Sequence, residues 1–191
     1  IKNNDKWVFG NESELEIYKK IKTNTVLLDD IADCKQGIVT GLDKAFITTT
    51  NEFADIPKNI IKTWIKVGDI NRYEVNPVEK RELIYTKQID DLEKYPLLKE
   101  RFLQFKTKLS NRREAKSGKL RWFELQWSRE SKLFNSNKLI CRFKASQNTF
   151  ALDTNKYYSS ADTTIVVVKK EFKDDYDLKF LLALVNSKLL D

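Results

Sequence analysis

The chain has 191 residues, of which 41% are hydrophobic, 12% aromatic and 33% charged, so it can bury a substantial core and is not expected to be disordered. It contains no His, which excludes Ser-His-Asp and Cys-His catalysis and any His-bound metal. No apolar run reaches the ~18 residues that a membrane span needs, and no signal peptide opens the chain; we therefore expect a cytoplasmic protein without a membrane partner.

The first half of the chain indicates one helix followed by short strands. Ile17 and Ile21 lie one helical turn apart within residues 12–22, with acids early and lysines late, which predicts a helix there. A strand or turn is predicted over 27–34. Further strands are predicted in three apolar or β-branched stretches, at 45–49, 64–67 and 83–86.

The second half contains the clearest helical pattern. Leu98, Phe102, Phe105 and Leu109 recur at intervals of four, three and four, which predicts a helix over 97–110. Later elements are predicted as strands at 138–143 and 163–168 and a final helix that starts near Asp177 and runs through Leu189. Because no regular βαβ order is visible, we expect one α+β domain over residues 1–191, with a twisted mixed, mainly antiparallel sheet flanked by helices.

Positive charge is concentrated in one part of the sequence. The net charge is +7, but residues 99–144 alone carry +10, which leaves −3 for the rest, and six of the eight arginines lie in this stretch. A basic stretch in a folded chain indicates a polyanionic partner, although a solubilising surface is the alternative. The polyanion interpretation requires these side chains to lie along one face of the folded chain.

Several kinds of chemistry are absent or weakly indicated. Neither G-x-G-x-x-G nor a Walker pattern occurs, so no nucleotide cofactor is expected by those routes. Cys34 and Cys141 have no metal-ligand spacing and are expected to be reduced thiols. A nuclease pattern, Asp162 with Glu171 and Lys173, is the alternative catalytic interpretation. No catalytic residue and no metal site are assigned to this chain; the absence of Met and an apparent helix at its end lead us to expect part of a longer protein.

Six segments resemble, in order, the TaqI-like specificity domain of adenine-specific DNA methyltransferases and single-chain restriction–modification enzymes. The opening segment, at 37–47, reads G-I-V-T-G-L-D-K-A-F-I, and the next, at 67–73, reads V-G-D-I-N-R-Y. The others are Tyr95-Pro96 with the basic helix and Arg112-Arg113, Trp122 with Leu125, the strand starting Lys138-Leu139-Ile140, and L-L-A-L-V-N-S-K at 181–188. The resemblance covers about 28–190.

This resemblance implies a module that recognises double-stranded DNA and is itself non-catalytic. The target adenine would be methylated at N6 by a catalytic domain of the same parent chain, which would hold S-adenosylmethionine, with Mg²⁺ only if a nuclease is fused. No cofactor is expected in this chain. The alternative within the same class is half of a type I restriction specificity subunit. The recognised sequence, cleavage by the parent and the oligomeric state stay open.

The site residues are predicted from side-chain chemistry. Phosphate contacts, which set the register on DNA, are expected from Lys44, Arg72, Lys99, Lys106, Lys108, Lys116, Lys119 and Lys132. Base reading suits Arg, Asn and Gln, and the candidates are Arg112, Arg113, Arg121, Gln126, Arg142, Lys144, Ser146, Gln147 and Asn148. Trp122 and Trp127 are expected mainly to fill the core. Gly37, Gly41 and Gly68 are expected in backbone turns, and Asp69 and Asp162 on backbone groups rather than metal.

Overall fold

A computed structural model describes residues 10–23, 25–49, 52–53 and 56–190. The chain divides into two compact units, residues 1–31 and 32–191. In the first unit, α1 (Glu12–Lys22) confirms the predicted helix and is followed by a short helix, α2 (Leu28–Ile31). Asn11 caps α1: its side chain accepts from the Glu14 amide at 2.9 Å, and the Glu14 carboxylate accepts from the Asn11 amide at 2.8 Å.

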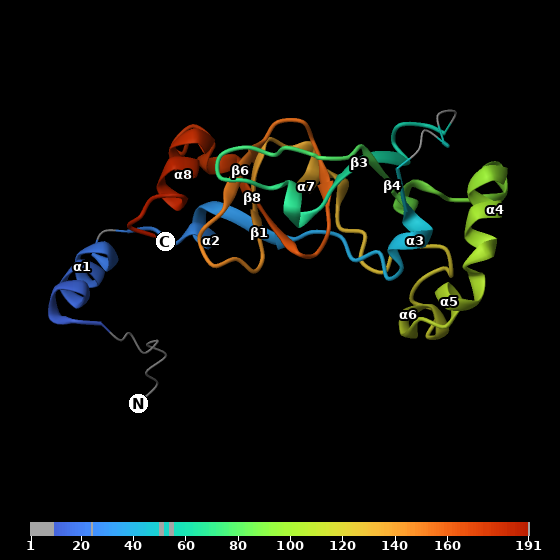
Figure 1. Ribbon diagram of the computed structural model, residues 1–191, viewed down its shortest axis with the longest axis horizontal. Helices are drawn as coiled ribbons and strands as arrows, with labels where there is room; N and C mark the ends of the chain where they lie inside the picture. Colours follow the sequence, from blue (N-terminus) through green and yellow to red (C-terminus); the bar gives the residue numbers. More distant parts are fainter. Residues whose placement is uncertain (1–9, 24, 50–51, 54–55, 191) are drawn as a thin grey trace. The chain divides into compact units, whose positions relative to one another are not determined.

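The second unit contains a four-stranded antiparallel sheet in the order β1-β8-β5-β6 (Figure 1). Its strands are β1 (Ala32–Gln36), β5 (Lys138–Arg142), β6 (Phe150–Asp153) and β8 (Thr163–Val168). The central strand, β8, is the β-branched run that the sequence marks as a strand. Ile165 stands opposite Lys35 on one side and Ile140 on the other, so β8 carries the core across the sheet.

A second four-stranded sheet has the order β2-β4-β3-β7. Its strands are β2 (Ile47–Thr48), β3 (Ile61–Ile65), β4 (Arg81–Ile84) and β7 (Tyr158–Ser159). All pairs in this sheet are antiparallel except β3 with β7, which is parallel. The predicted α+β class with mainly antiparallel pairing is therefore confirmed, and the structure distributes the strands over two sheets.

The remaining helices are short. They are α3 (Asp43–Phe46), α4 (Pro96–Gln104), α5 (Lys106–Ser110), α6 (Arg113–Lys116), α7 (Ser131–Asn135) and α8 (Leu178–Val185). The predicted helix over 97–110 is present in two pieces, because the backbone of Phe105 leaves helical geometry at φ −109° and ψ 5°. Within the second unit, α4, α5 and α6 gather at one end, beyond α3 (Figure 1).

Several predicted element boundaries differ from the structure, among them 27–34, which contains α2, and tertiary contacts account for two of the differences. The strand expected over 45–49 begins as α3, and the Arg101 guanidinium donates to the carbonyls of Lys44 and Ala45 in α3 and of Ile47 at the start of β2. The last helix ends at Val185, since the next residue, Asn186, has its side chain bonded to both backbone groups of Phe150 on β6, at 3.0 and 2.9 Å.

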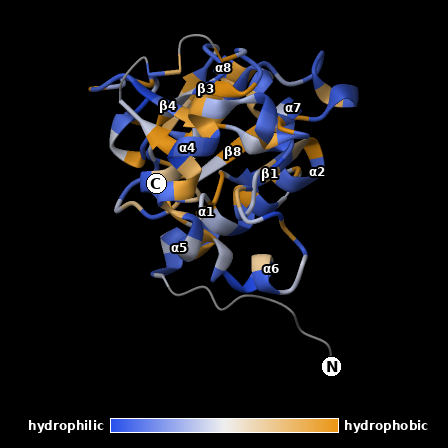
Figure 2. Cartoon of the chain, turned by 90° about the vertical axis from the view of Figure 1, so that its right-hand side faces the viewer, coloured by the Kyte–Doolittle hydropathy of each residue, from blue (hydrophilic) through white to orange (hydrophobic). Residues whose placement is uncertain are grey.

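One aromatic-rich core runs through the second unit. Phe134 stacks on Tyr158 with ring centres 4.3 Å apart, and Tyr85 meets Tyr158 edge-on at 5.3 Å. Hydrophobic residues accordingly gather on β3, β4 and β8, whereas α5 is mostly hydrophilic (Figure 2). Among the residues that the structure describes, no helix combines the length and the apolar character needed to cross a bilayer.

Candidate nucleic-acid interface

The β5–β6 loop, residues 142–148, is fixed at both ends. The Arg142 guanidinium donates to the Ile70 carbonyl at 2.7 and 3.0 Å, and the Phe143 amide donates to the Asp162 carbonyl at 2.8 Å. At the other end, the Asn148 carbonyl accepts from Arg72 Nε at 2.9 Å. Between these anchors residues 143–147 are exposed, so a rigid frame presents Lys144, Ser146 and Gln147 to solvent.

A hollow of about 390 Å³ adjoins this loop. It is lined by Gln36, Val67, Phe143, Lys144, Ala161 and Asp162. Phe143 is 51% exposed although it is a large apolar side chain, and large exposed apolar groups at polar rims are typical of binding surfaces. The main chain of Asp162 is held here: its carbonyl accepts from the Phe143 amide at 2.8 Å, and its amide donates to Ser160 Oγ at 3.3 Å.

Arg112 is half-buried and holds several segments together. Its guanidinium donates to the carbonyls of Thr40 (3.3 Å), Leu109 (3.0 Å), Trp122 (2.9 Å) and Glu124 (2.7 Å). Burial lowers the pKa of Arg112, while Glu114 and Glu124 oppose that shift. With its donors directed to these carbonyls, Arg112 positions the loops around it.

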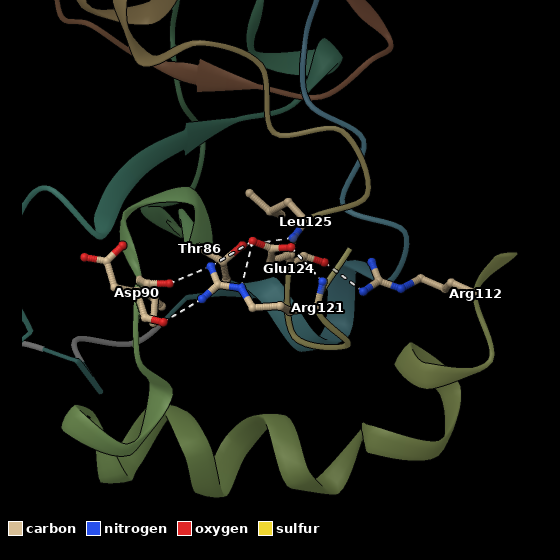
Figure 3. Close-up of polar contacts among 7 residues, drawn as sticks. Thr86, Asp90, Arg112, Arg121, Glu124 and Leu125 are labelled. Carbon is tan, nitrogen blue, oxygen red and sulfur yellow. Dashed lines mark hydrogen bonds and ion pairs between the residues drawn. The ribbon is translucent and has the colours of Figure 1, made fainter. Parts of the chain in front are cut away.

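Arg121 is exposed, but its guanidinium also binds groups of the fold. It donates to the carbonyls of Ile89 (2.7 Å) and Asp90 (2.6 Å) and pairs with the Glu124 carboxylate at 2.8 Å (Figure 3). Close by, the Leu125 amide donates to the Thr86 hydroxyl at 2.9 Å. The segment that follows α6 is therefore tied to residues 86–90, which follow β4, in part by Arg121, a side chain that the sequence assigned to base reading.

The other predicted side chains of this stretch lie closer to solvent. The Arg113 side chain is 88% exposed and pairs with Glu114, and Gln126 Nε2 donates to the same carboxylate at 3.3 Å. A local backbone hydrogen bond lowers the pKa of the Glu114 carboxyl most, and the hydrogen bond from Arg113 lowers it further. These contacts leave Arg113 at the surface and hold Gln126 in a half-buried position.

The predicted phosphate-binding lysines occupy several elements. Six of them are exposed. On or after α5 and α6 lie Lys106, Lys108, Lys116 and Lys119, whereas α3 carries Lys44 and α7 carries Lys132. Lys99 is half-buried and pairs with Glu93 at 2.6 Å. In Figure 1, α5 and α6 lie at one end of the unit, away from the sheet that contains β6 and β8. The basic residues of 99–144 are therefore divided between separate parts of the unit.

Trp127 and Arg129 form a feature that the sequence did not indicate. Trp122 packs against the core, as expected, but Trp127 is 49% exposed, so the expectation of a core role was wrong for it. Trp127 extends from a two-way backbone bridge with Val39, and Arg129 lies over its ring at 5.8 Å. The sequence carries no signal for this arrangement, because Arg129 adopts a left-handed backbone, φ 58°, that side-chain type does not predict.

The nuclease interpretation loses its geometric basis. Asp162 precedes β8 and Glu171 follows it, so the six-residue strand Thr163–Val168 separates them. At about 3.3 Å per residue, a strand of this length keeps two carboxylates too far apart to share one ion. Within the described part of the chain, no group of three or more His, Cys, Asp or Glu side chains is placed to hold a metal.

These features are typical of a binding module: a rigid α+β frame with exposed basic and aromatic side chains on its loops. The family model described as TaqI-like C-terminal specificity domain matches residues 65–191, well over half of the chain. The chain therefore belongs to the family of TaqI-like C-terminal specificity domains. The segments at 67–73 and 181–188 lie inside the matched residues, and the resembling segment at 37–47 lies before them.

Individual relatives agree with this assignment. The type II methyltransferase M.MjaIV of Methanocaldococcus jannaschii is 30% identical over 174 residues, which cover 85% of this chain and 56% of that protein. The type II methyltransferase M.BstVI of Geobacillus stearothermophilus is 23% identical over 163 residues, covering 80% of this chain and 28% of that protein. The chain thus spans about half the length, or less, of these curated relatives.

The fold also has a counterpart among solved structures. The Type IIL restriction-modification enzyme MmeI, solved in complex with DNA, superimposes with a TM-score of 0.57 at 12% identity. The alignment covers 84% of this chain and 21% of the MmeI chain. At that identity the likeness concerns the fold: the α+β arrangement of two sheets and short helices recurs within a larger enzyme.

Proposed function

We propose that this chain recognises a short sequence in double-stranded DNA for an N6-adenine DNA methyltransferase or restriction–modification enzyme. Membership of a specificity-domain family supports the role, and the DNA complex of MmeI supports the choice of partner. The observation that carries the proposal is the loop at 142–148: its two ends are hydrogen-bonded to the frame, and its exposed tip carries side chains that suit base edges.

We assign the predicted residues to three roles, for which their contacts are the support. Lys144, Ser146 and Gln147 at the loop tip read bases, with Asn148 beside them. The exposed helix lysines neutralise phosphates and set the register without reading sequence. Arg112, Arg121 and Arg142 act through the carbonyls they bind, as positioning residues, because a guanidinium that already donates to backbone is not available to a base edge.

The parent protein would supply the chemistry. The two named methyltransferase relatives support a methyl donor, S-adenosylmethionine, in the parent's catalytic domain, which is the second expected partner of this chain. The residues present here do not fit that donor. Its usual cradle is a cluster of glycines before a helix, and the five glycines of this sequence are dispersed, so no step of the reaction is assigned to this chain.

Binding of selected DNA tests the proposal. The chain is first used to enrich a preferred duplex from a random pool. Gln147→Ala should weaken binding to this duplex by about 1–3 kcal/mol, roughly 5- to 150-fold in affinity, and should leave affinity for random duplex unchanged. The matched controls are Lys106→Ala and Lys108→Ala, which should weaken both duplexes alike and reduce the salt slope by about one per contact. Absence of duplex binding at ~50 mM salt would contradict the proposal.

A further inference from the structure

A second surface of the same unit forms a groove that the DNA-reading loop does not use. The groove has a volume of about 660 Å³ and lies beside β1 and α7. We call it the Trp127 groove. The residues that matter most for its chemistry are Lys35, Lys87, Trp127, Arg129, Glu130 and Lys132. Asp33 also lines it, so four cations face two carboxylates and the groove carries a net positive charge.

Trp127 is an exposed aromatic on a fixed backbone. Its amide donates to the Val39 carbonyl at 2.9 Å, and the Val39 amide donates to the Trp127 carbonyl at 3.1 Å. The residue is nevertheless 49% exposed, unlike Trp64, which is 1% exposed in the core. A ring held by its backbone but open to solvent offers a surface for stacking at little cost in side-chain ordering.

Arg129 is held beside this ring in an unfavourable backbone conformation. Its φ of 58° is left-handed, which a residue with a Cβ rarely adopts. Two contacts maintain it: Arg129 Nε donates to the Gly37 carbonyl at 3.1 Å, and the Tyr85 hydroxyl donates to the Arg129 carbonyl at 2.7 Å. Backbone strain that is over-determined in this way clusters at ligand sites.

Three lysines complete the rim. Lys35 projects from β1, an edge strand of its sheet, and Lys132 from α7, and both are exposed. Lys87 forms an ion pair with Glu130 and so neutralises one of the two carboxylates of the groove. The charges that remain favour an anion, and the ring favours a flat partner.

Together these groups match the two halves of a nucleotide. Aromatic rings bind bases by stacking, and clustered Lys and Arg bind the phosphates of the same strand. We propose that the Trp127 groove binds an unpaired nucleotide of a DNA strand, with its base against Trp127 and its phosphate among Lys35, Lys87 and Lys132. The choice of a DNA strand as the source rests on the proposed function. The volume lies within the range of small-ligand sites, about 300–1,000 Å³.

The test uses the whole chain and a labelled hexathymidylate single strand, followed by fluorescence anisotropy at low salt. Trp127→Ala should weaken binding about 5- to 150-fold, since stacking contributes ~1–3 kcal/mol per base, and Trp127→Phe should restore most of the affinity. Lys35→Ala with Lys132→Ala should weaken binding and reduce the salt slope by about 0.7 per lost contact. Lys58→Ala with Lys94→Ala removes the same charge at exposed positions outside the groove and outside the predicted phosphate-binding set, and should change affinity less than twofold.

Unchanged binding in both the Trp127→Ala and the paired lysine variants would overturn the proposal. Because each variant also retains the loop at 142–148, selected duplex is measured in parallel. If the groove variants bind both the duplex and the single strand as the unmodified chain does, the groove proposal alone is refuted. If the unmodified chain binds no duplex, the proposed function is refuted instead. Free thymidine monophosphate that competes as well as the strand would overturn the assignment of the ligand to a DNA strand.

Discussion

The ammonium of Lys138 and the carboxylate of Asp153 lie 2.5 Å apart, and both side chains are completely buried where β5 pairs with β6. Lys138 Nζ also donates to the Phe134 carbonyl at 2.6 Å, and Asp153 accepts from the amides of Asn155 and Tyr157 at 2.8 and 3.0 Å. One ion pair therefore joins the end of α7 to the segment that passes from the first sheet to the second. Burial lowers the pKa of Lys138, and Asp153 opposes that shift.

Removal of one partner of this ion pair should be strongly destabilising. Lys138→Met leaves the Asp153 carboxylate buried without its cation, and breaking a buried pair costs about 3–5 kcal/mol. Urea denaturation measures the loss. Lys119→Met, at an exposed position, is the matched control and should change stability by less than ~0.5 kcal/mol. A loss below ~1 kcal/mol for Lys138→Met would show that the pair is not needed by the fold.

Gly37 and Gly68 should respond oppositely to alanine. A Cβ on Gly37 would lie 2.2 Å from the Ser160 carbonyl oxygen and 2.4 Å from that of Ser159, both backbone atoms, so strands must separate to admit it. Gly37→Ala should cost more than about 2 kcal/mol in unfolding free energy. A Cβ on Gly68 meets no atom within 4 Å, and Gly68→Ala should be tolerated. Equal thermal midpoints for the two variants would contradict the close approach at Gly37.

Arg112 and Arg113 are neighbours in sequence that should differ in what they stabilise. Arg112→Ala removes a guanidinium that donates to four carbonyls and should cost about 2–4 kcal/mol, because several of those acceptors become unsatisfied. Arg113→Ala removes an 88% exposed side chain and should leave stability within ~0.5 kcal/mol. Chemical denaturation of both variants checks this. Equal stability of the two variants would return Arg112 to the set of base-reading candidates.

Cys141 should make stability dependent on pH in the alkaline range. Burial raises the pKa of its thiol from 9.0 to about 11. In the unfolded chain the thiol ionises first, so its contribution is fully present below pH 9 and is lost as the pH rises toward 11. The stability difference between the wild-type chain and Cys141→Ala should therefore shrink by about 2 kcal/mol between pH 8 and 10.5. Urea titrations at both pH values measure it, and a constant difference would refute a buried thiol.

Elements with local sequence patterns were predictable before folding is considered. The β-branched run at Thr163–Val168 became the central strand β8, and α1 was predicted with its bounds, because its caps and charges lie within one turn of its ends. The α+β class and the family followed from elements and short motifs in order along the chain.

Which charged side chains face solvent depends instead on contacts between distant segments. Arg112 and Arg113 are adjacent residues of the same type and charge. They differ because the Thr40 carbonyl that accepts from Arg112 lies 72 residues away in sequence. Likewise, the exposure of Trp127 depends on a backbone bridge to Val39 and on the strained Arg129. Periodicity and composition report local preferences, whereas the direction of a guanidinium or an indole is set by acceptors that folding brings from distant segments.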